Sequence, residues 1–240
     1  NEKSLQIICI QIKEFIAKQN IKKEKILGIG INLSGRINYR TGYSYSYFNF
    51  YEDPLSKYFE QELGINTVLE NDTKALSYAE FNSGIIKNEK DVLFINIDTG
   101  IGLGILINNN IYYGKSGFSG EFGHIPIFEN EILCRCGKIG CLETEASGHA
   151  LRRIVIDRLK NGGTSILNRK FENYDNIKLN DIIVAAQKDD NLSIESINYI
   201  GDKLGRGIAA LINIFNPELI VVGGIIAKAD DYLSLPLLNS

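Results

Sequence analysis

Two features that many functional classes require are missing from this sequence. It has no run of about 18 apolar residues, which excludes a membrane-spanning helix, and no signal peptide is evident. Positive charge is not in excess either, since 26 Lys and Arg oppose 29 Asp and Glu and the net charge is −3. Such a chain has no general attraction for nucleic acid or for anionic lipid. These absences predict a cytoplasmic protein with no membrane partner.

The familiar nucleotide-binding fingerprints are missing as well. No Gly-Lys-Ser/Thr phosphate loop occurs, and no glycine pattern matches the dinucleotide fingerprint. Instead the composition is that of an ordinary globular protein, with 44% hydrophobic and 23% charged residues. A chain of 240 residues suits one large domain or two small ones.

Cysteine and histidine are scarce, with four and two residues, but most of them lie in one stretch, residues 120–143. They are His124, Cys134, Cys136 and Cys141. A Cys-x-Cys pair with a third Cys and an upstream His can converge on one tetrahedral ion, and zinc takes such ligands. Buried free cysteines with a core histidine are the alternative. The clustering favours metal ligands in a reducing compartment over a disulfide framework, and we expect a structural Zn²⁺.

The other cysteine and histidine carry no metal-like spacing. Cys9 lies inside an apolar run and is predicted to be a packed core thiol. His149 has no metal-spaced neighbour and is predicted to lie on a helix surface.

Apolar periodicity predicts an α/β fold in which strands alternate with helices around a largely buried sheet. Helices are expected over residues 3–19, 54–63, 73–83, 148–160, 179–187 and 194–215. Strands are expected over residues 25–32, 67–70, 91–97 and 218–224, with a hairpin over 105–114. Residues 162–180 are expected to form a polar excursion, and the chain to end shortly after a strand.

Three short polar or glycine-rich segments lie at the ends of predicted strands. Asn71-Asp72 is placed either to cap the next helix or to bind a ligand at the strand end. Thr99 and the glycines that follow it suit a phosphate, or only a tightly packed hairpin. Gly223-Gly224 suits close approach of a ligand, or only a turn.

Aromatic residues concentrate in one further segment, residues 42–51, where tyrosines alternate with small polar residues. One interpretation is a loop or edge strand with a buried aromatic side. The other is a wall of a ligand pocket, because a tyrosine offers a flat face and a hydroxyl.

Together these motifs resemble one family, the ROK proteins, which comprise sugar kinases and sugar-responsive repressors. The motifs that carry the resemblance are LENDTKALSYAE (69–80), DTGIGLGI (98–105), GKSGFSGEFGH (114–124), CRCGKIGCLE (134–143) and NPELIVVGG (216–224). The resemblance implies a two-lobed, actin-like (ribonuclease H-like) fold with a zinc-binding loop. Residues 1–87 would form part of a small N-terminal lobe and residues 88–240 a larger lobe.

The resemblance also implies site residues. A sugar in the cleft between the lobes would be bound through its hydroxyls by Asn71, Asp72, Glu121, His124 and Glu143. His124 would serve twice, with one ring nitrogen on zinc and the other toward the sugar. In a kinase Asp72 would be the general base, and ATP with Mg²⁺ would bind at Thr99, Gly100, Gly223 and Gly224.

Departures from the kinase pattern favour the repressor branch. The Asp-x-Gly-Gly-Thr phosphate hairpin of the kinases is missing, through truncation upstream of Asn1 or through loss, and Leu33-Ser34-Gly35 stands where kinases usually read Pro-Gly. The segments NLSGRIN, TGYSYSYFNF, ENDTKA and YYGKSGFSGEFGH most resemble the repressor branch. We expect a fragment of a regulator, with its operator DNA bound through a helix-turn-helix absent from this chain. Its ligand would be a sugar or sugar phosphate, and its assembly a homodimer or homotetramer. Two alternatives remain: an ATP-dependent sugar kinase, and a sugar-binding domain that neither regulates DNA binding nor transfers phosphate. The hydroxyl-binding residues do not identify the sugar, and residues 43–51 are a candidate source of selectivity.

Overall fold

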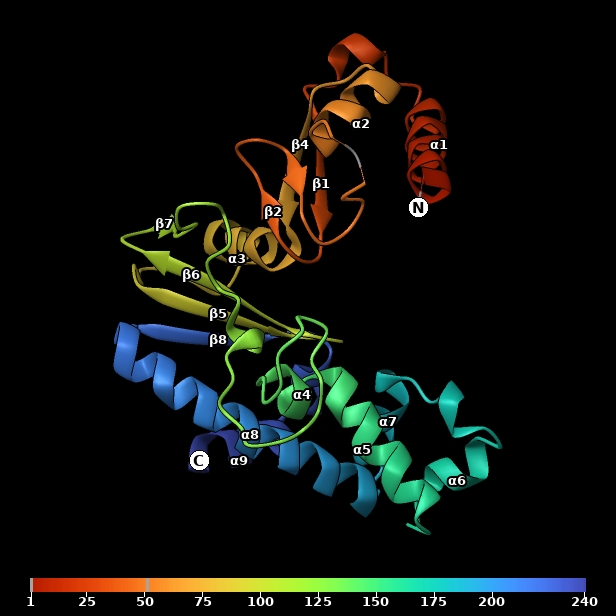
Figure 1. Cartoon of the computed structure of the whole chain (residues 1–240), viewed down its shortest axis with the longest axis vertical. Coiled ribbons are helices and arrows are strands. Elements are labelled where there is room, and N and C mark those ends of the chain that lie inside the picture. The colour runs from red at the N-terminus through yellow and green to blue at the C-terminus, as the bar shows by residue number, and fades with distance from the viewer. Residues whose placement is uncertain (1, 51) are drawn as a thin grey trace. The chain divides into compact units, whose positions relative to one another are not determined.

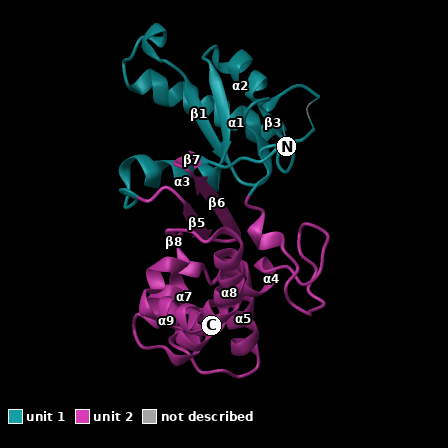
Figure 2. Ribbon diagram, turned by 90° about the vertical axis from the view of Figure 1, so that its left-hand side faces the viewer, with its two compact units in different colours: residues 1–88, 111–119 teal, residues 89–110, 120–240 magenta. Residues whose placement is uncertain are grey.

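The computed structural model describes residues 2–50 and 52–240. Its internal contacts divide the chain into two compact units (Figure 2). Unit 1 comprises residues 1–88 and 111–119, and unit 2 comprises residues 89–110 and 120–240. The segment 111–119 therefore belongs with the N-terminal residues although both of its sequence neighbours lie in unit 2.

The predicted alternation of strands and helices is met only in part (Figure 1): strands follow one another over residues 29–44 and 92–111, and helices follow one another over residues 143–215. The helices are α1 (Glu2–Lys18), α2 (Leu55–Leu63), α3 (Asp72–Ser83), α4 (Glu143–Ala146), α5 (Gly148–Lys160), α6 (Ile166–Lys170), α7 (Leu179–Ala186), α8 (Asn191–Phe215) and α9 (Asp231–Asn239). The strands are β1 (Ile29–Leu33), β2 (Ile37–Asn38), β3 (Tyr43–Ser44), β4 (Thr67–Asn71), β5 (Val92–Ile97), β6 (Ile101–Ile107), β7 (Asn110–Ile111) and β8 (Leu219–Gly223). Single 3₁₀ turns are η1 (Lys23–Lys25), η2 (Phe122–His124), η3 (Tyr174–Asn176) and η4 (Ile226–Ala229).

Unit 1 is built on the parallel pair β1 and β4, in which Leu33 lies opposite Asn71. Helix α2 ends at Gly64, which adopts the left-handed conformation (φ 60°) that glycine reaches without strain. The core of unit 1 brings together α1, α2, β2 and β4 through their buried apolar side chains. These are Leu5, Cys9, Ile37, Leu55, Phe59, Leu63 and Leu69.

Unit 2 contains the four-stranded sheet β7-β6-β5-β8, in which β5 pairs antiparallel with β6 and parallel with β8. Alternate residues of β5 and β6 face one core with α8, as the two-residue repeat of a strand requires. The members from these elements are Leu93, Ile95, Ile97, Ile101, Leu103, Ile105, Ile197, Ile200, Leu204 and Ile208. Helix α8 ends at Asn216, in the left-handed conformation, directly before Pro217.

Most predicted elements are present, and the core thiol of Cys9 and the surface position of His149 are confirmed. The buried strand predicted over residues 25–32 is wrong in part. Strand β1 begins only at Ile29 and is half-exposed, and the side chain of Leu27 before it is 99% exposed. Apolar spacing in the helix predicted over residues 3–19 includes Phe15, yet this residue is 64% exposed, whereas Leu5 and Cys9 of the same helix are buried. Within the described residues β1 pairs only with β4, and no residue of β1 is fully buried, whereas a strand covered on both faces would be.

Three short helices, α4, α6 and α9, were not predicted, and one strand is longer than predicted. Helix α6 lies in the supposed polar excursion, where Ser165 caps it and Leu167 anchors it in the core. Helix α9 follows β8 although it contains Pro236, and it packs against α8. Strand β6 begins at Ile101, so the glycine-rich segment is itself a hairpin strand. Among the described helices, none combines the length and apolar character that crossing a bilayer requires.

Candidate functional site

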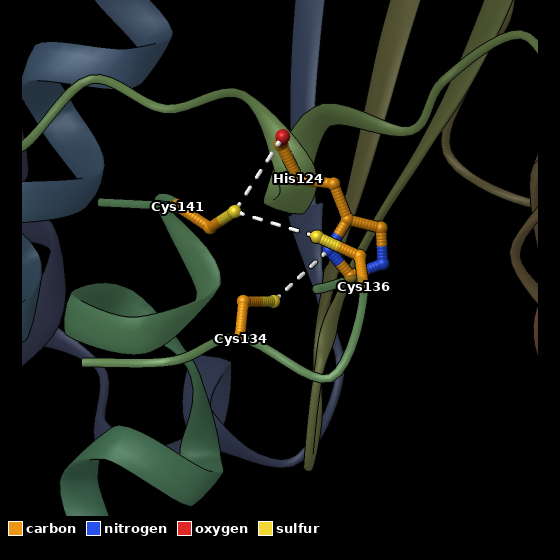
Figure 3. Close-up of side chains that lie close together, drawn as sticks. All are labelled: His124, Cys134, Cys136 and Cys141. Carbon is orange, nitrogen blue, oxygen red and sulfur yellow. Dashed lines mark hydrogen bonds between the residues drawn. The ribbon is translucent and has the colours of Figure 1, made fainter. Parts of the chain in front are cut away.

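The four predicted metal ligands converge within unit 2 (Figure 3). The ligand atoms of His124, Cys134, Cys136 and Cys141 all lie within 4.8 Å of one another. His124 Nδ1 is 3.4 Å from Cys134 Sγ, and Cys136 Sγ is 3.6 Å from Cys141 Sγ. All three cysteines are free thiols.

This arrangement fits a tetrahedral metal ion. A Zn–S bond of about 2.3 Å places two thiolates of a tetrahedron about 3.8 Å apart, close to the Cys136–Cys141 separation of 3.6 Å. Three thiolates and an imidazole are the donors of a closed structural site, which leaves no position for substrate. The residues therefore suit a metal that holds the fold rather than one that performs chemistry.

The loop reaches this geometry through tight turns and two isolated β-bridges. The backbone N–H of Gly137 donates to Cys134 O (2.9 Å), closing the turn that carries the first two thiols. Bridges join Pro126 to Cys141 and Leu133 to Ile139. Gly140 has φ 74°, and a Cβ there would lie 2.1 Å from Phe128 O, so only glycine fits before the last ligand.

The thiols have unequal pKa values when no metal is bound. Burial raises the pKa of Cys134, and burial together with the neighbouring thiols raises that of Cys141 to about 12. Burial also opposes ionisation of Cys136, but hydrogen bonds from the Lys138 backbone and the neighbouring thiols leave its pKa below the ordinary value. Because metal binds thiolates, uptake must displace protons.

His124 links the metal cluster to a carboxylate. Its Nδ1 faces Cys134, whereas its Nε2 lies 4.0 Å from Glu121 Oε2. This distance is longer than a hydrogen bond, so Glu121 lies near the ring nitrogen at which a partner would orient a metal-bound imidazole, without being hydrogen-bonded to it. Glu121 lies directly before η2, the 3₁₀ turn that carries His124.

Glu143, the first residue of α4, turns its buried carboxylate toward the β5–β6 hairpin. Its Oε2 accepts a hydrogen bond from the N–H of Ile101 (3.1 Å), and its Oε1 lies 3.2 Å from Arg135 Nε. A Cβ at Gly100 would lie 2.7 Å from the same Oε2. The hairpin turn, the metal loop and the start of α4 therefore meet at this carboxylate.

The predicted glycines of unit 2 gather at the end of its sheet. Thr99 and Gly100 form the β5–β6 turn, and Gly223 lies opposite Asn96 at the end of β8. Gly224 has φ 95°, and a Cβ there would lie 2.4 Å from Ile97 O. Thr99-Gly100 and Gly223-Gly224 therefore lie at the carboxyl ends of the adjacent parallel strands β5 and β8. This is the position at which α/β sheets commonly bind ligands.

Asn71 and Asp72 lie in unit 1, where the parallel register of β1 and β4 brings them beside Ser34 and Gly35. The side-chain oxygen of Asn71 caps α3 by accepting from Lys74 N (3.1 Å), as predicted, and its Nδ2 donates to Gly35 O (3.0 Å). Asp72 Oδ1 accepts from Thr73 N (2.7 Å), and Oδ2 accepts from the Ser34 hydroxyl (2.5 Å). Capping therefore uses the amide oxygen of Asn71, while both oxygens of Asp72 are held by protein donors.

The tyrosine-rich segment is mostly bends, with β3 as its only strand residues among those described, and Tyr51 lies outside the described residues. Aromatic pairs within unit 1 fix its rings. Tyr45 meets Phe118 edge-on (5.2 Å), and Tyr39 stacks on Tyr113 (4.0 Å). The backbone is thus the loop of the first alternative, but its aromatic side is not buried, since Tyr45, Tyr47 and Phe50 are 46–50% exposed. These rings lie in the same unit as Asn71 and Asp72.

Two residues of the site were not predicted. Ser34 entered the sequence analysis only as a departure from the kinase pattern, and Arg135 only as the residue between two cysteines. Nothing in the sequence near either residue indicates which carboxylate it contacts.

The chain is similar to proteins of one family. The family model described as ROK family matches residues 1–239. A glucokinase of Halalkalibacterium halodurans is 34% identical over 218 residues, covering 90% of this chain and 66% of that protein. The crystal structure of a ROK family transcriptional regulator, a homolog of E. coli MLC protein, superposes with a TM-score of 0.84 at 31% identity, covering 99% of this chain and 60% of that one.

A ROK family glucokinase from Streptomyces griseus, solved in complex with glucose and AMPPNP, superposes with a TM-score of 0.85 at 28% identity. It is matched over 98% of this chain and 77% of its own. The chain thus spans 60–77% of the length of these three proteins and 55–56% of several repressors that it also matches, so both regulators and glucokinases are among its relatives.

Proposed function

The chain belongs to the ROK family, and we propose that it is the sugar-sensing effector domain of a ROK transcriptional regulator. It has the actin-like α/β fold of the family, with a Cys₃His cluster that fits a metal ion. In this proposal the metal is zinc, and the ligand is a sugar or sugar phosphate. DNA is bound by a helix-turn-helix outside residues 1–240, in a cytoplasmic homodimer or homotetramer.

The observation that carries the sugar-binding part of the proposal is the way in which the Asp72 carboxylate is held. Its two oxygens accept hydrogen bonds from Thr73 N and from the Ser34 hydroxyl. A carboxylate fixed in this way is suited to accept a hydrogen bond from a sugar hydroxyl, because its orientation costs no further entropy on binding. We propose that Asn71 and Asp72 bind the same sugar as Glu121, His124 and Glu143, with the metal holding the second set in place.

Regulation requires that the sugar favour one arrangement of the protein over another. A ligand shifts such an equilibrium only by its difference in affinity for the two arrangements. A coupling of about 1–3 kcal/mol is typical. Two groups of sugar-binding residues that belong to separate units supply a physical basis for that difference, since closing both on one ligand fixes the units relative to each other.

An ATP-dependent sugar kinase is the second candidate, favoured by the glucokinase relative and by the presence of Asp72. In that function Asp72 would be the general base, and Thr99, Gly100, Gly223 and Gly224 would line the site for ATP and Mg²⁺. The glycine pairs at the end of the β5–β8 sheet are compatible with it, because they allow backbone amides to approach a phosphate.

One pair of measurements on the complete gene product separates the two functions. Calorimetry with glucose, mannose, N-acetylglucosamine and their 6-phosphates should identify a ligand, and that ligand should change operator affinity in a gel-shift or anisotropy assay. A coupled ADP-release assay with the same sugars should show no turnover. Turnover that disappears in Asp72→Asn would establish the kinase and overturn the regulator.

A further inference from the structure

Arg135 occupies the single position between two metal ligands, Cys134 and Cys136, and its side chain reaches Glu143. The Arg135 Nε–Glu143 Oε1 distance is 3.2 Å, and the side chains are 57% and 11% exposed, respectively. The guanidinium thus meets the carboxylate at the edge of the protein interior.

The carboxylate of Glu143 is held from two directions. Arg135, from the metal loop, contacts Oε1, and the N–H of Ile101, at the start of β6, donates to Oε2 (3.1 Å). Two donors on opposite oxygens fix both the position and the rotation of a carboxylate. Loss of either donor would leave the group free to turn about its last bond.

Glycines leave space for the Glu143 carboxylate and the Arg135 guanidinium. A Cβ at Gly100 would lie 2.7 Å from Glu143 Oε2 and 3.3 Å from Arg135 Nη2. A Cβ at Gly123 would lie 3.3 Å from the same carboxylate oxygen. The pair therefore packs directly against backbone at two places, where a larger residue would displace it.

From this geometry we propose that Arg135 is a positioning residue that sets the orientation of Glu143 for the sugar. The inference rests on the proposed role of Glu143 in sugar binding. It assigns Arg135 no contact with the ligand: the guanidinium acts through the carboxylate. Because Arg135 lies between Cys134 and Cys136, the metal that holds those thiolates also holds the base of this side chain, and the orientation of Glu143 depends on the metal through Arg135.

The test compares Arg135→Ala with Lys138→Ala, which removes the same charge from an exposed position in the same loop. The first readout needs no sugar: amide hydrogen exchange at Ile101, whose N–H is held by Glu143. The Ile101 amide of Arg135→Ala should exchange about fivefold or more faster, with metal content and exchange in β5 and in the rest of β6 unchanged. Lys138→Ala should match the wild type, and Arg135→Lys should fall between, since lysine is a single point charge.

The second readout is affinity for the best ligand among glucose, mannose, N-acetylglucosamine and their 6-phosphates. Arg135→Ala should weaken binding about tenfold, as loss of a charge-assisted contact does. In a Glu143→Gln background Arg135→Ala should have almost no further effect, because the two act as one unit. A full tenfold loss in that background would show that Arg135 contacts the ligand itself and would overturn the positioning role.

The outcomes distinguish failure of the positioning role of Arg135 from failure of the proposed sugar-sensing function. Unchanged Ile101 exchange in Arg135→Ala overturns the positioning of Glu143, whatever the sugar data show. Faster exchange at Ile101 in a protein that binds none of the sugars upholds the positioning and refutes the proposed function.

Discussion

The hydroxyl of Ser34 donates a 2.5 Å hydrogen bond to Oδ2 of Asp72, although the two residues are 38 positions apart. The parallel pairing of β1 with β4 makes this contact, because Ser34 follows β1 and Asp72 follows β4 at the same edge. In Ser34→Ala the carboxylate loses one of its two fixing donors. We expect sugar affinity to fall about fivefold, which corresponds to about 1 kcal/mol for a hydrogen bond.

Calorimetry on the ligand that binds wild-type protein measures this change. Ser83→Ala is the matched control, since Ser83 ends α3 and is exposed. Equal affinities of Ser34→Ala and wild type would show that Asp72 does not need Ser34 to bind sugar.

The metal cluster gives a second prediction. Elemental analysis should find about one zinc per chain, and Cys136→Ser should lose it, because a structural zinc supplies folding free energy to the loop that binds it. Hydrogen exchange should then accelerate over residues 120–143. Cys9→Ala, which removes a buried thiol from the core of unit 1, should keep the metal.

The pKa values of the thiols set the pH dependence of that metal. Since burial keeps Cys134 and Cys141 protonated in the metal-free protein, uptake releases protons and apparent affinity should rise with pH. Competition with a chelator between pH 6 and 8 measures this change in apparent metal affinity. Metal-free protein that binds sugar as tightly as the metal-loaded form would refute a supporting role for the cluster.

The sequence predicted the metal cluster and the helix cap at Asn71 because both depend on local spacing. Cysteine and histidine intervals decide which side chains can reach one ion, and Asn71 caps the helix that begins beside it. The contact of Ser34 with Asp72 depends on strand pairing, and the contact of Arg135 with Glu143 depends on how a loop folds back. Neither follows from the residues near it in sequence.

Elements stabilised by tertiary contacts were the ones missed. Helix α9 contains Pro236, which local rules assign to a helix end, but α9 packs along α8 and persists. Strand β1 has the apolar composition of a buried strand, yet composition does not show which of its sides is covered.

A buried aspartate gives a prediction on pH and stability. Asp190 caps α8, and its oxygens accept four hydrogen bonds, from Ser165 Oγ, Ile166 N, Ser193 N and Ser193 Oγ. Burial opposes ionisation, but these donors outweigh it and hold the pKa of Asp190 below its usual range. Asp190→Asn keeps a capping oxygen but turns an amide N–H₂ toward a buried donor. It should lower the free energy of unfolding by about 2–3 kcal/mol at pH 7.

The sign of the pH effect follows from the lowered pKa. The stabilisation is fully present above the unfolded-state pKa of about 3.9 and is lost as pH falls through the folded-state value. The difference between wild type and Asp190→Asn in urea titrations should therefore be constant from pH 7 to 5 and shrink below pH 4. Asp189→Asn, at an exposed neighbouring position, is the control. A difference that does not change with pH would mean that the charge of Asp190 contributes nothing.

A buried lysine supports the segment that leads to Glu121. Lys74 of α3 is 4% exposed, and its Nζ donates to Gly117 O (2.8 Å) and lies 6.0 Å from the Tyr113 ring centroid. Tyr113 in turn donates to Glu70 Oε2 (2.8 Å), and burial followed by this bond raises the pKa of Tyr113. The ammonium thus joins α3 to the segment 111–119 within unit 1.

Lys74→Met keeps the apolar stem but leaves the Gly117 carbonyl without this donor. We expect the free energy of unfolding of unit 1 to fall by about 1–3 kcal/mol, the cost of a buried unsatisfied group, and exchange over residues 111–119 to accelerate. Lys57→Met, at an exposed position in α2 whose ion pair with Asp53 is also exposed, should change neither, because surface ion pairs contribute little. Wild-type exchange over 111–119 in Lys74→Met would show that the other contacts of the segment, such as the Tyr113–Glu70 hydrogen bond, hold it without Lys74. Sugar affinity should also fall in Lys74→Met, because the segment that Lys74 anchors is followed directly by Gly120 and Glu121.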